Sequence, residues 1–198
     1  MRLGITNRVG SRLVAQFMVA VLAAGCAVPA DKLAPVVPAG STYRLGAGDQ
    51  VRITTFGEPG LTGDFRVDDS GKVALPLAGG ARAAGLTPLE LAYGVSDLLE
   101  KSGLYKDAKV SVEVTQYRPI FILGEVAKPG QYAYQPGMTV LTAVAIAGGF
   151  TYRAVTNRFS IVRQNGSPGA DGATAEGRAE RDTALAPSDV VTVYERVF

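Results

Sequence analysis

Four acidic residues close together in the chain are the first candidates for chemistry: Glu58, Asp64, Asp68 and Asp69. Two carboxylates that flank a glycosidic bond can act as acid and base, so a glycan hydrolase is one function to consider. However, Asp68 and Asp69 lie in an Asp-Asp-Ser-Gly turn, and Glu58 precedes a Pro-Gly break. Structural roles are therefore favoured, and we predict that none of the four is catalytic.

The composition restricts the chemistry further. The 198 residues include no His and a single Cys. These counts exclude Ser-His-Asp and Cys-His catalysis, thiolate zinc sites and an internal disulfide. The Gly pairs at 79–80 and 148–149 match no phosphate-binding pattern, and turns or helix ends explain them better. We therefore predict no enzymatic activity, no metal and no cofactor.

Cys26 is the one residue for which the sequence predicts a covalent role. Arginines within the first twelve residues precede an apolar run over residues 13–25. This pattern is typical of a secretory signal peptide, and the run is too short for a bilayer span of roughly 20 residues. Ala-Ala-Gly stands directly before Cys26, as in a bacterial lipoprotein signal, so we predict that Cys26 is lipidated. The alternative is ordinary cleavage nearby, after Ala30, with Cys26 incidental.

The residues around this cysteine also predict a location. In bacterial lipoproteins an Asp after the acylated Cys usually retains the protein at the inner membrane, and this chain has Ala27 there. We therefore expect a lipid anchor in the outer membrane of a Gram-negative bacterium, with the protein on the periplasmic face. The signal peptide covers residues 1–25, and the Pro- and Ala-rich residues 26–42 form a tether.

The surface groups identify no ligand. The chain has 20 basic and 18 acidic residues, and three of the basic ones lie in the signal peptide, so nothing indicates nucleic-acid binding. Arg153 and Arg158 could meet an acidic polymer or a neighbouring subunit, although a solvated surface is the default. Several tyrosines could stack on sugar rings, with core packing as the alternative. They are Tyr105, Tyr117, Tyr132, Tyr134 and Tyr152.

The first half of the folded chain has the pattern of a small α+β unit. Alternating apolar residues predict strands over 51–56, 65–67, 72–77 and 109–115. A capping box at Thr87 and Glu90, with Pro88 at the first helical position, predicts a helix that ends near Ser102. We expect its apolar residues to form one buried stripe. They are Leu89, Ala92, Tyr93, Val95, Leu98 and Leu99.

The second half of the folded chain also has the pattern of a small α+β unit. Strands are predicted over 120–126, 131–134, 158–163 and 190–194, with a helix over 139–147 that ends at Gly148-Gly149. Residues 165–184 contain few apolar side chains, and we expect a loop there. The predicted fold class is α+β, with two small modules of short mixed strands and one helix each.

Short motifs stand in order along both halves of the folded chain. The first half contains Tyr43-Arg-Leu-Gly-x-Gly-Asp49 and Leu75-Pro-Leu77, and the second half contains Gly124-Glu-Val126, Lys128-Pro-Gly130 and Pro187-Ser-Asp-Val190. The first set resembles the polysaccharide export domain of outer-membrane capsule and exopolysaccharide exporters, here over residues 43–117. The second set resembles the soluble-ligand-binding β-grasp domain that follows it in that family, here over 118–198.

This resemblance implies a lipoprotein that forms a homo-oligomeric ring in the periplasm and passes a polysaccharide across the outer membrane. The partner it implies is an inner-membrane chain-length regulator or co-polymerase. Long family members add β-grasp repeats and a C-terminal helix that forms the pore, whereas this chain has one β-grasp unit and ends at Phe198. We therefore expect a separate partner, such as an outer-membrane β-barrel, to complete the route. The alternative is a monomeric periplasmic module that binds a small ligand or acts as an adaptor.

Overall fold

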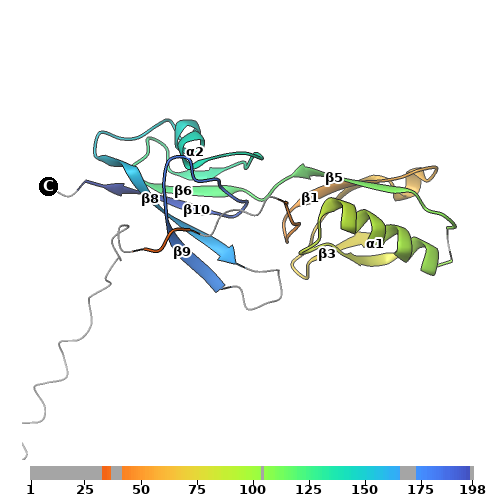
Figure 1. Ribbon diagram of the computed structural model, residues 1–198. Helices are drawn as coiled ribbons and strands as arrows, with labels where there is room; N and C mark the ends of the chain where they lie inside the picture. Colours follow the sequence, from red (N-terminus) through yellow and green to blue (C-terminus); the bar gives the residue numbers. More distant parts are fainter. Residues whose placement is uncertain (1–32, 37–41, 104, 166–172, 197–198) are drawn as a thin grey trace, which may run out of the picture.

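The chain folds into two α+β modules that lie end to end, each with its own hydrophobic core (Figure 1). The computed structural model describes residues 33–36, 42–103, 105–165 and 173–196. We call residues 42–117 module 1 and residues 118–196 module 2. The predicted fold class, two modules of short mixed strands with one helix each, is confirmed.

Module 1 is built on a three-stranded antiparallel sheet. Its central strand β1 (Gln50–Thr55) pairs with β2 (Gly63–Arg66) on one side and with β5 (Val110–Gln116) on the other. The short 3-10 helix η2 (Pro59–Leu61) lies between β1 and β2. A separate hairpin consists of β3 (Lys72–Leu75) and β4 (Gly79–Arg82). Because β1 alternates between buried and exposed residues, one face of the sheet packs on the core and the other faces outward.

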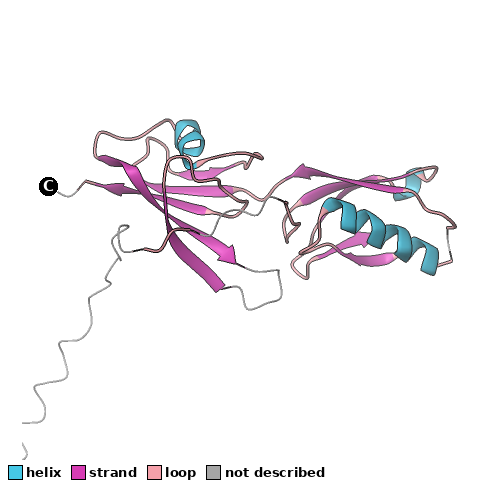
Figure 2. Ribbon diagram, in the orientation of Figure 1, coloured by secondary structure: helices cyan, strands magenta, loops and turns pink. Residues whose placement is uncertain are grey.

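Helix α1 (Pro88–Lys101) covers the core of module 1, and both signals predicted for its start are present (Figure 2). Thr87 accepts a hydrogen bond from the Glu90 backbone, and the Glu90 side chain accepts one from the Thr87 backbone. The predicted buried stripe is wrong at two positions, since Leu89 is 63% exposed and Tyr93 68% exposed. The apolar residues of this helix occupy more than one face, and the narrow core contacts only one of them. That face consists of Leu91, Ala92, Val95 and Leu99.

Module 2 is a five-stranded mixed sheet in the order β7-β6-β10-β8-β9. The first and last strands of the module, β6 and β10, are parallel neighbours in the centre, and the other pairs are antiparallel. Helix α2 (Val140–Ile146), capped by Thr139, packs against one face, which gives a β-grasp. The strand bounds are β6 (Ile120–Gly124), β7 (Gly130–Tyr132), β8 (Ala154–Asn165), β9 (Ala173–Ala179) and β10 (Val190–Glu195).

Two strands appear where the sequence predicts turns or loops. β9 lies within the loop expected over 165–184, and β4 begins at the glycine pair 79–80, for which turn duties were predicted. Small residues and glycine give both segments little strand propensity of their own. Pairing with a neighbour supplies the missing stability, because β9 pairs with β8 from Ala173 to Ala179 and β4 pairs with β3. These strands are therefore determined by tertiary contacts.

Neither helix in the described part of the chain has the length and apolar character that a membrane crossing requires.

Candidate functional site

The structure repeats one local arrangement in both modules, around Asp49 and Asp189. Each aspartate directly precedes a strand, β1 or β10, and is 0% or 1% exposed, respectively. Each accepts a hydrogen bond from the backbone N–H three residues earlier, at 2.8 Å from Gly46 and 2.7 Å from Ala186. The preceding residue has a positive φ in both cases. A buried carboxylate is stable only with such partners, so each turn is closed around its aspartate.

The Asp49 carboxylate also binds the segment that joins the two modules. One of its oxygens accepts from the Arg118 backbone N–H at 3.0 Å and from the Arg118 Nε at 3.3 Å. The other oxygen accepts a hydrogen bond from the Tyr43 hydroxyl. Burial raises the pKa of Tyr43 well above its ordinary value, and the hydrogen bond to Asp49 raises it further. The cluster therefore ties the start of module 1 to the start of module 2.

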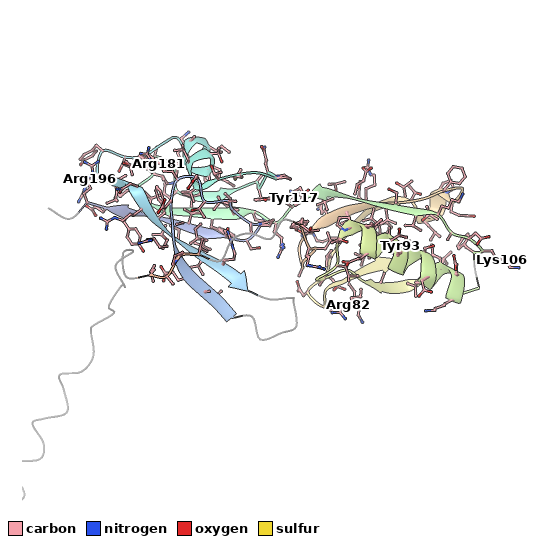
Figure 3. All side chains as sticks on the ribbon, viewed as in Figure 1. Arg82, Tyr93, Lys106, Tyr117, Arg181 and Arg196 are labelled. Atoms are coloured by element: carbon pink, nitrogen blue, oxygen red, sulfur yellow. The ribbon has the colours of Figure 1, made fainter. Side chains whose placement is uncertain are left out.

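Aromatic side chains continue this contact into module 2. Tyr117 lies at the boundary between the modules (Figure 3). Its ring meets that of Tyr43 at 4.9 Å and 74°, and that of Tyr134 at 5.6 Å and 71°. Each such edge-to-face pair contributes about 0.5–1.5 kcal/mol beyond the burial of its surface. The junction is thus a packed contact in which the Tyr117 ring lies between Tyr43 of module 1 and Tyr134 of module 2.

The equivalent aspartate of module 2 is satisfied within that module. Arg163 donates to the two oxygens of Asp189, from Nε at 2.9 Å and from Nη2 at 2.6 Å. Its Nη2 also donates to the Ala184 carbonyl at 3.0 Å, and only 7% of Arg163 is exposed. Bidentate pairs of this kind fix geometry as well as charge. Asp189 therefore holds the β10 turn against β8, whereas Asp49 acts across the junction.

Two of the four acidic residues considered for catalysis, Asp64 and Asp68, have partners of their own. Asp64 forms two hydrogen bonds with Arg52, at 2.9 and 2.7 Å, and Asp68 accepts from the Ser70 hydroxyl and the Lys72 backbone. The bond from Arg52 lowers the pKa of Asp64, and the bond from Ser70 lowers that of Asp68. A general acid near neutral pH needs a raised pKa, so these shifts have the wrong direction for that role.

The tyrosines considered for sugar stacking separate into two groups. Tyr117 and Tyr134 belong to the junction, while Tyr132 and Tyr105 pack against the cores of modules 2 and 1, respectively. Only Tyr152 of the predicted five is strongly exposed, at 90%.

The two arginines considered for contact with an acidic polymer both lie in module 2. Arg153 forms an ion pair with Glu195, and Arg158 lies on β8. Cys26 lies outside the described residues. Within the described ranges, no group of three or more acidic or cysteine side chains is placed to hold a metal.

Sequence reasoning did not identify the junction cluster. The Gly46-x-Gly48-Asp49 turn before a strand is the signal that could have marked Asp49. Nothing marked Arg118, because its contact with Asp49 joins residues 69 positions apart.

Comparison with known proteins now defines the class of this chain. Residues 37–115 match the family described as "Polysaccharide biosynthesis/export protein", and residues 119–173 match the SLBB domain. Together the two matches cover most of both modules. The chain therefore belongs to the polysaccharide export family and combines an export domain with an SLBB domain, as the motifs predicted.

Curated relatives carry related names. Exopolysaccharide production protein ExoF of Rhizobium meliloti is 35% identical over 187 residues, which cover 89% of this chain and 42% of the relative. The EPS I polysaccharide export outer membrane protein EpsA of Ralstonia solanacearum is 30% identical over 126 residues, covering 62% of this chain and 32% of the relative. Its counterpart in Ralstonia nicotianae is 28% identical over 142 residues, covering 58% and 36%. The chain thus spans about two fifths or less of the length of these relatives.

Proposed function

We propose that this chain is a periplasm-facing lipoprotein of the outer membrane that oligomerises into a ring and serves export of a capsular polysaccharide or exopolysaccharide. The observation that carries the proposal is the succession of an export domain and an SLBB domain across both modules. The relatives support it, because they are named for exopolysaccharide production and for polysaccharide export in the outer membrane. The proposed role is conduction of a polymer without chemistry on it.

An exposed apolar sheet face in module 2 supports self-association. Helix α2 packs against the face that contains Ile120 and Ile122. On the opposite face, Phe121 is 38% exposed and Leu123 46% exposed. The outward face of the module 1 sheet is different, since Arg52 lies between Asp64 and Glu113 on the neighbouring strands. Charged residues suit water, whereas an apolar sheet face of this kind favours a protein partner.

A second apolar surface lies on α1. Leu89 and Tyr93, four positions apart, lie on its outward side, and Gly94 follows them in the middle of the helix. A Cβ added at Gly94 would meet nothing within 4 Å, so packing inside this chain does not explain a glycine there. Glycine in a helix costs about 1 kcal/mol relative to alanine. A close approach by a neighbouring subunit would account for both features.

Two different apolar surfaces on one chain suit a head-to-tail assembly. When one surface of each copy contacts the other surface of the next, the contacts generate a ring if the rotation closes. A ring leaves a hydrated lumen, and weak contacts with the polymer let it move through. The proposed partners are further copies of this chain, the polysaccharide and an inner-membrane chain-length regulator.

Particle mass and export together test the proposal. Mature protein at micromolar concentration in mild detergent is expected to sediment as a closed oligomer. Leu123→Arg on the outward face of module 2 should reduce the particle to a monomer and stop polymer secretion. The matched control Thr54→Arg, at an exposed position of β1, should do neither. A strictly monomeric wild-type particle that binds a small molecule tightly would instead support a ligand-binding or adaptor protein.

The lipid anchor has its own test. Cys26→Ser is expected to abolish incorporation of radiolabelled palmitate and to release the protein from the membrane fraction. Unchanged labelling in this variant would refute the assignment.

A further inference from the structure

Three basic side chains lie on one outward face of module 1. In the hairpin, Lys72 of β3 lies directly opposite Arg82 of β4, and both are exposed. The next residue of β3, Val73, is buried and forms a bridge with buried Val67, which follows β2. Because side chains alternate along a strand, exposed Arg66 points to the same outward face. We call Arg66, Lys72 and Arg82 the basic face.

The basic face has no ion pair within the described part of the chain. The nearest carboxylate along the strands belongs to Asp68, whose backbone N–H donates to the Lys72 carbonyl. That carboxylate accepts from the Ser70 hydroxyl at 2.7 Å and from the Lys72 backbone N–H at 2.9 Å. The bond from Ser70 is the largest cause of the lowered pKa of Asp68, and the charge of Lys72 is the smallest. By contrast, Arg52 on β1 has Asp64 as its partner.

This arrangement costs stability in the free protein. Like charges directly opposite each other on antiparallel strands are destabilising, because their Cβ atoms lie only about 4.5–5.5 Å apart. A Cβ added at Gly80 would lie 3.4 Å from the Lys72 Cδ, so the stem of Lys72 extends over β4 and away from Asp68. Module 1 contains 8 basic and 10 acidic residues, so its overall charge does not explain the gathering of three cations. An anionic ligand would explain it.

The floor of the basic face is flat and built from small residues. Ala74 and Gly80 lie opposite each other on the two strands of the hairpin, and both are exposed. The centre of a protein–protein interface is normally rich in aromatic and other large side chains, which these two positions lack. A small-residue floor beside cations instead suits a hydrated chain that carries carboxylates along its length.

We infer that the basic face binds carboxylate groups of the transported polymer, which makes that polymer an acidic polysaccharide; this inference rests on the proposed export function. The expected substrate class is a polymer with uronic acids or acidic acyl substituents. Exposed ion pairs are individually weak, so a single face holds the polymer loosely. In the proposed ring every copy presents the same face, and repeated weak contacts retain a chain without fixing it in place.

Oligosaccharide binding tests the inference. Mature protein in mild detergent would be titrated into a fluorescently labelled galacturonate oligomer, and binding would be followed by anisotropy. The same oligomer with its carboxylates methyl-esterified is the neutral control. We expect the acidic probe to bind at least about tenfold more tightly than the ester at low salt. The difference should shrink in about 0.5 M salt, because screening weakens exposed ion pairs. Equal binding of the two probes at low salt would overturn the inference.

Paired charge removals locate the binding. Lys72→Gln/Arg82→Gln should weaken binding of the acidic probe about fivefold or more and leave binding of the ester unchanged. The matched control Lys106→Gln/Lys109→Gln removes the same charge at the far end of module 1, away from Arg82, and should bind like wild type (Figure 3). Equal weakening in both variants would overturn the inference, since only overall charge would then matter.

Urea unfolding shows whether the two cations have structural roles instead. The Lys72→Gln/Arg82→Gln protein should be at least as stable as wild type, because the variant removes a pair of like charges. A clear loss of stability would show that the cations have partners in the free protein, and it would overturn the inference.

Vesicles and secretion separate the other outcomes. If phosphatidylglycerol vesicles bind more tightly than the acidic oligomer and lose binding in Lys72→Gln/Arg82→Gln, the basic face is a membrane contact and the inference is wrong. If cells without this chain still secrete the polymer, the proposed function fails, while the oligomer titration still decides whether the face binds carboxylates. If secretion stops but the wild-type polymer contains no acidic groups, the export function stands and this inference is overturned.

Discussion

Asp49→Ala is expected to destabilise module 1 more than the loss of an exposed ion pair does. The Asp49 carboxylate is 0% exposed and accepts two backbone bonds, from Gly46 at 2.8 Å and from Arg118 at 3.0 Å. It also accepts from the Arg118 Nε at 3.3 Å and from the Tyr43 hydroxyl. Alanine removes every one of these acceptors and leaves their donors in a site built for a carboxylate.

The burial of the cluster determines how much free energy of unfolding is lost in Asp49→Ala. A buried donor without a partner costs about 1–3 kcal/mol, and removal of one partner from a buried ion pair costs about 3–5 kcal/mol. The Arg118 side chain retains 21% exposure, so water partly solvates the guanidinium once the carboxylate is gone. We therefore expect a loss of about 3 kcal/mol in the free energy of unfolding. For a unit of this size that corresponds to a fall of roughly 12–24 °C in Tm.

Scanning calorimetry and urea unfolding followed by circular dichroism would measure this loss. Asp64→Ala, which removes a partner from the exposed Arg52 pair, is the control and should change stability little. Asp189→Ala should instead lower the transition of module 2, because its carboxylate binds Arg163 within that module. If Asp49→Ala and Asp64→Ala cost the same, the reasoning about the buried cluster is wrong.

Three further predictions concern local features. Thr87→Ala removes the N-cap of α1 and should cost about 1 kcal/mol in urea unfolding, whereas no change would contradict the capping role. Gly71→Ala should lower the free energy of unfolding more than Gly57→Ala. Both glycines have positive φ, but only at Gly71 would the new Cβ lie 2.5 Å from the Ala84 Cβ. Equal losses of stability in the two variants would exclude that clash. The raised pKa of Tyr43 means that the folded state holds its proton more tightly than the unfolded state, where the pKa is near 10.0. Stability should therefore fall as the pH rises above 10, and a Tyr43→Phe protein that loses as much stability over that range would exclude this contribution.

The sequence predicted the features whose causes are local. The capping box of α1 and the glycines that end α2 depend on residues a few positions apart, and both lie where they were expected. The alternation of β1 and β5 likewise identified correctly which of their residues face the core, because a period of two determines which face a side chain occupies.

Features that depend on distant partners were not predictable in this way. The segment of β9 contains no large apolar residue, and its strand conformation depends on pairing with β8 and on the backbone hydrogen bonds of Arg178 with Ala34 and Val36. Leu89 and Tyr93 have the spacing of a buried stripe, yet the part of the core that faces α1 is filled by a neighbouring face of the helix. The Asp49 cluster joins residues from Tyr43 to Arg118, a separation over which spacing carries no information.

The two buried aspartates indicate why a conduit protein would keep charged clusters that perform no chemistry. An apolar junction could be as stable as the charged one, since buried ion pairs add little net stability over well-packed hydrophobic residues. Charged hydrogen bonds differ in being directional, so the Asp49 cluster accepts only a narrow range of positions for Arg118 and the segment that follows it. In the proposed ring every copy must present its two apolar surfaces at the same angle, because a head-to-tail contact closes only when each step repeats the same rotation. A rigid junction between the modules meets that requirement.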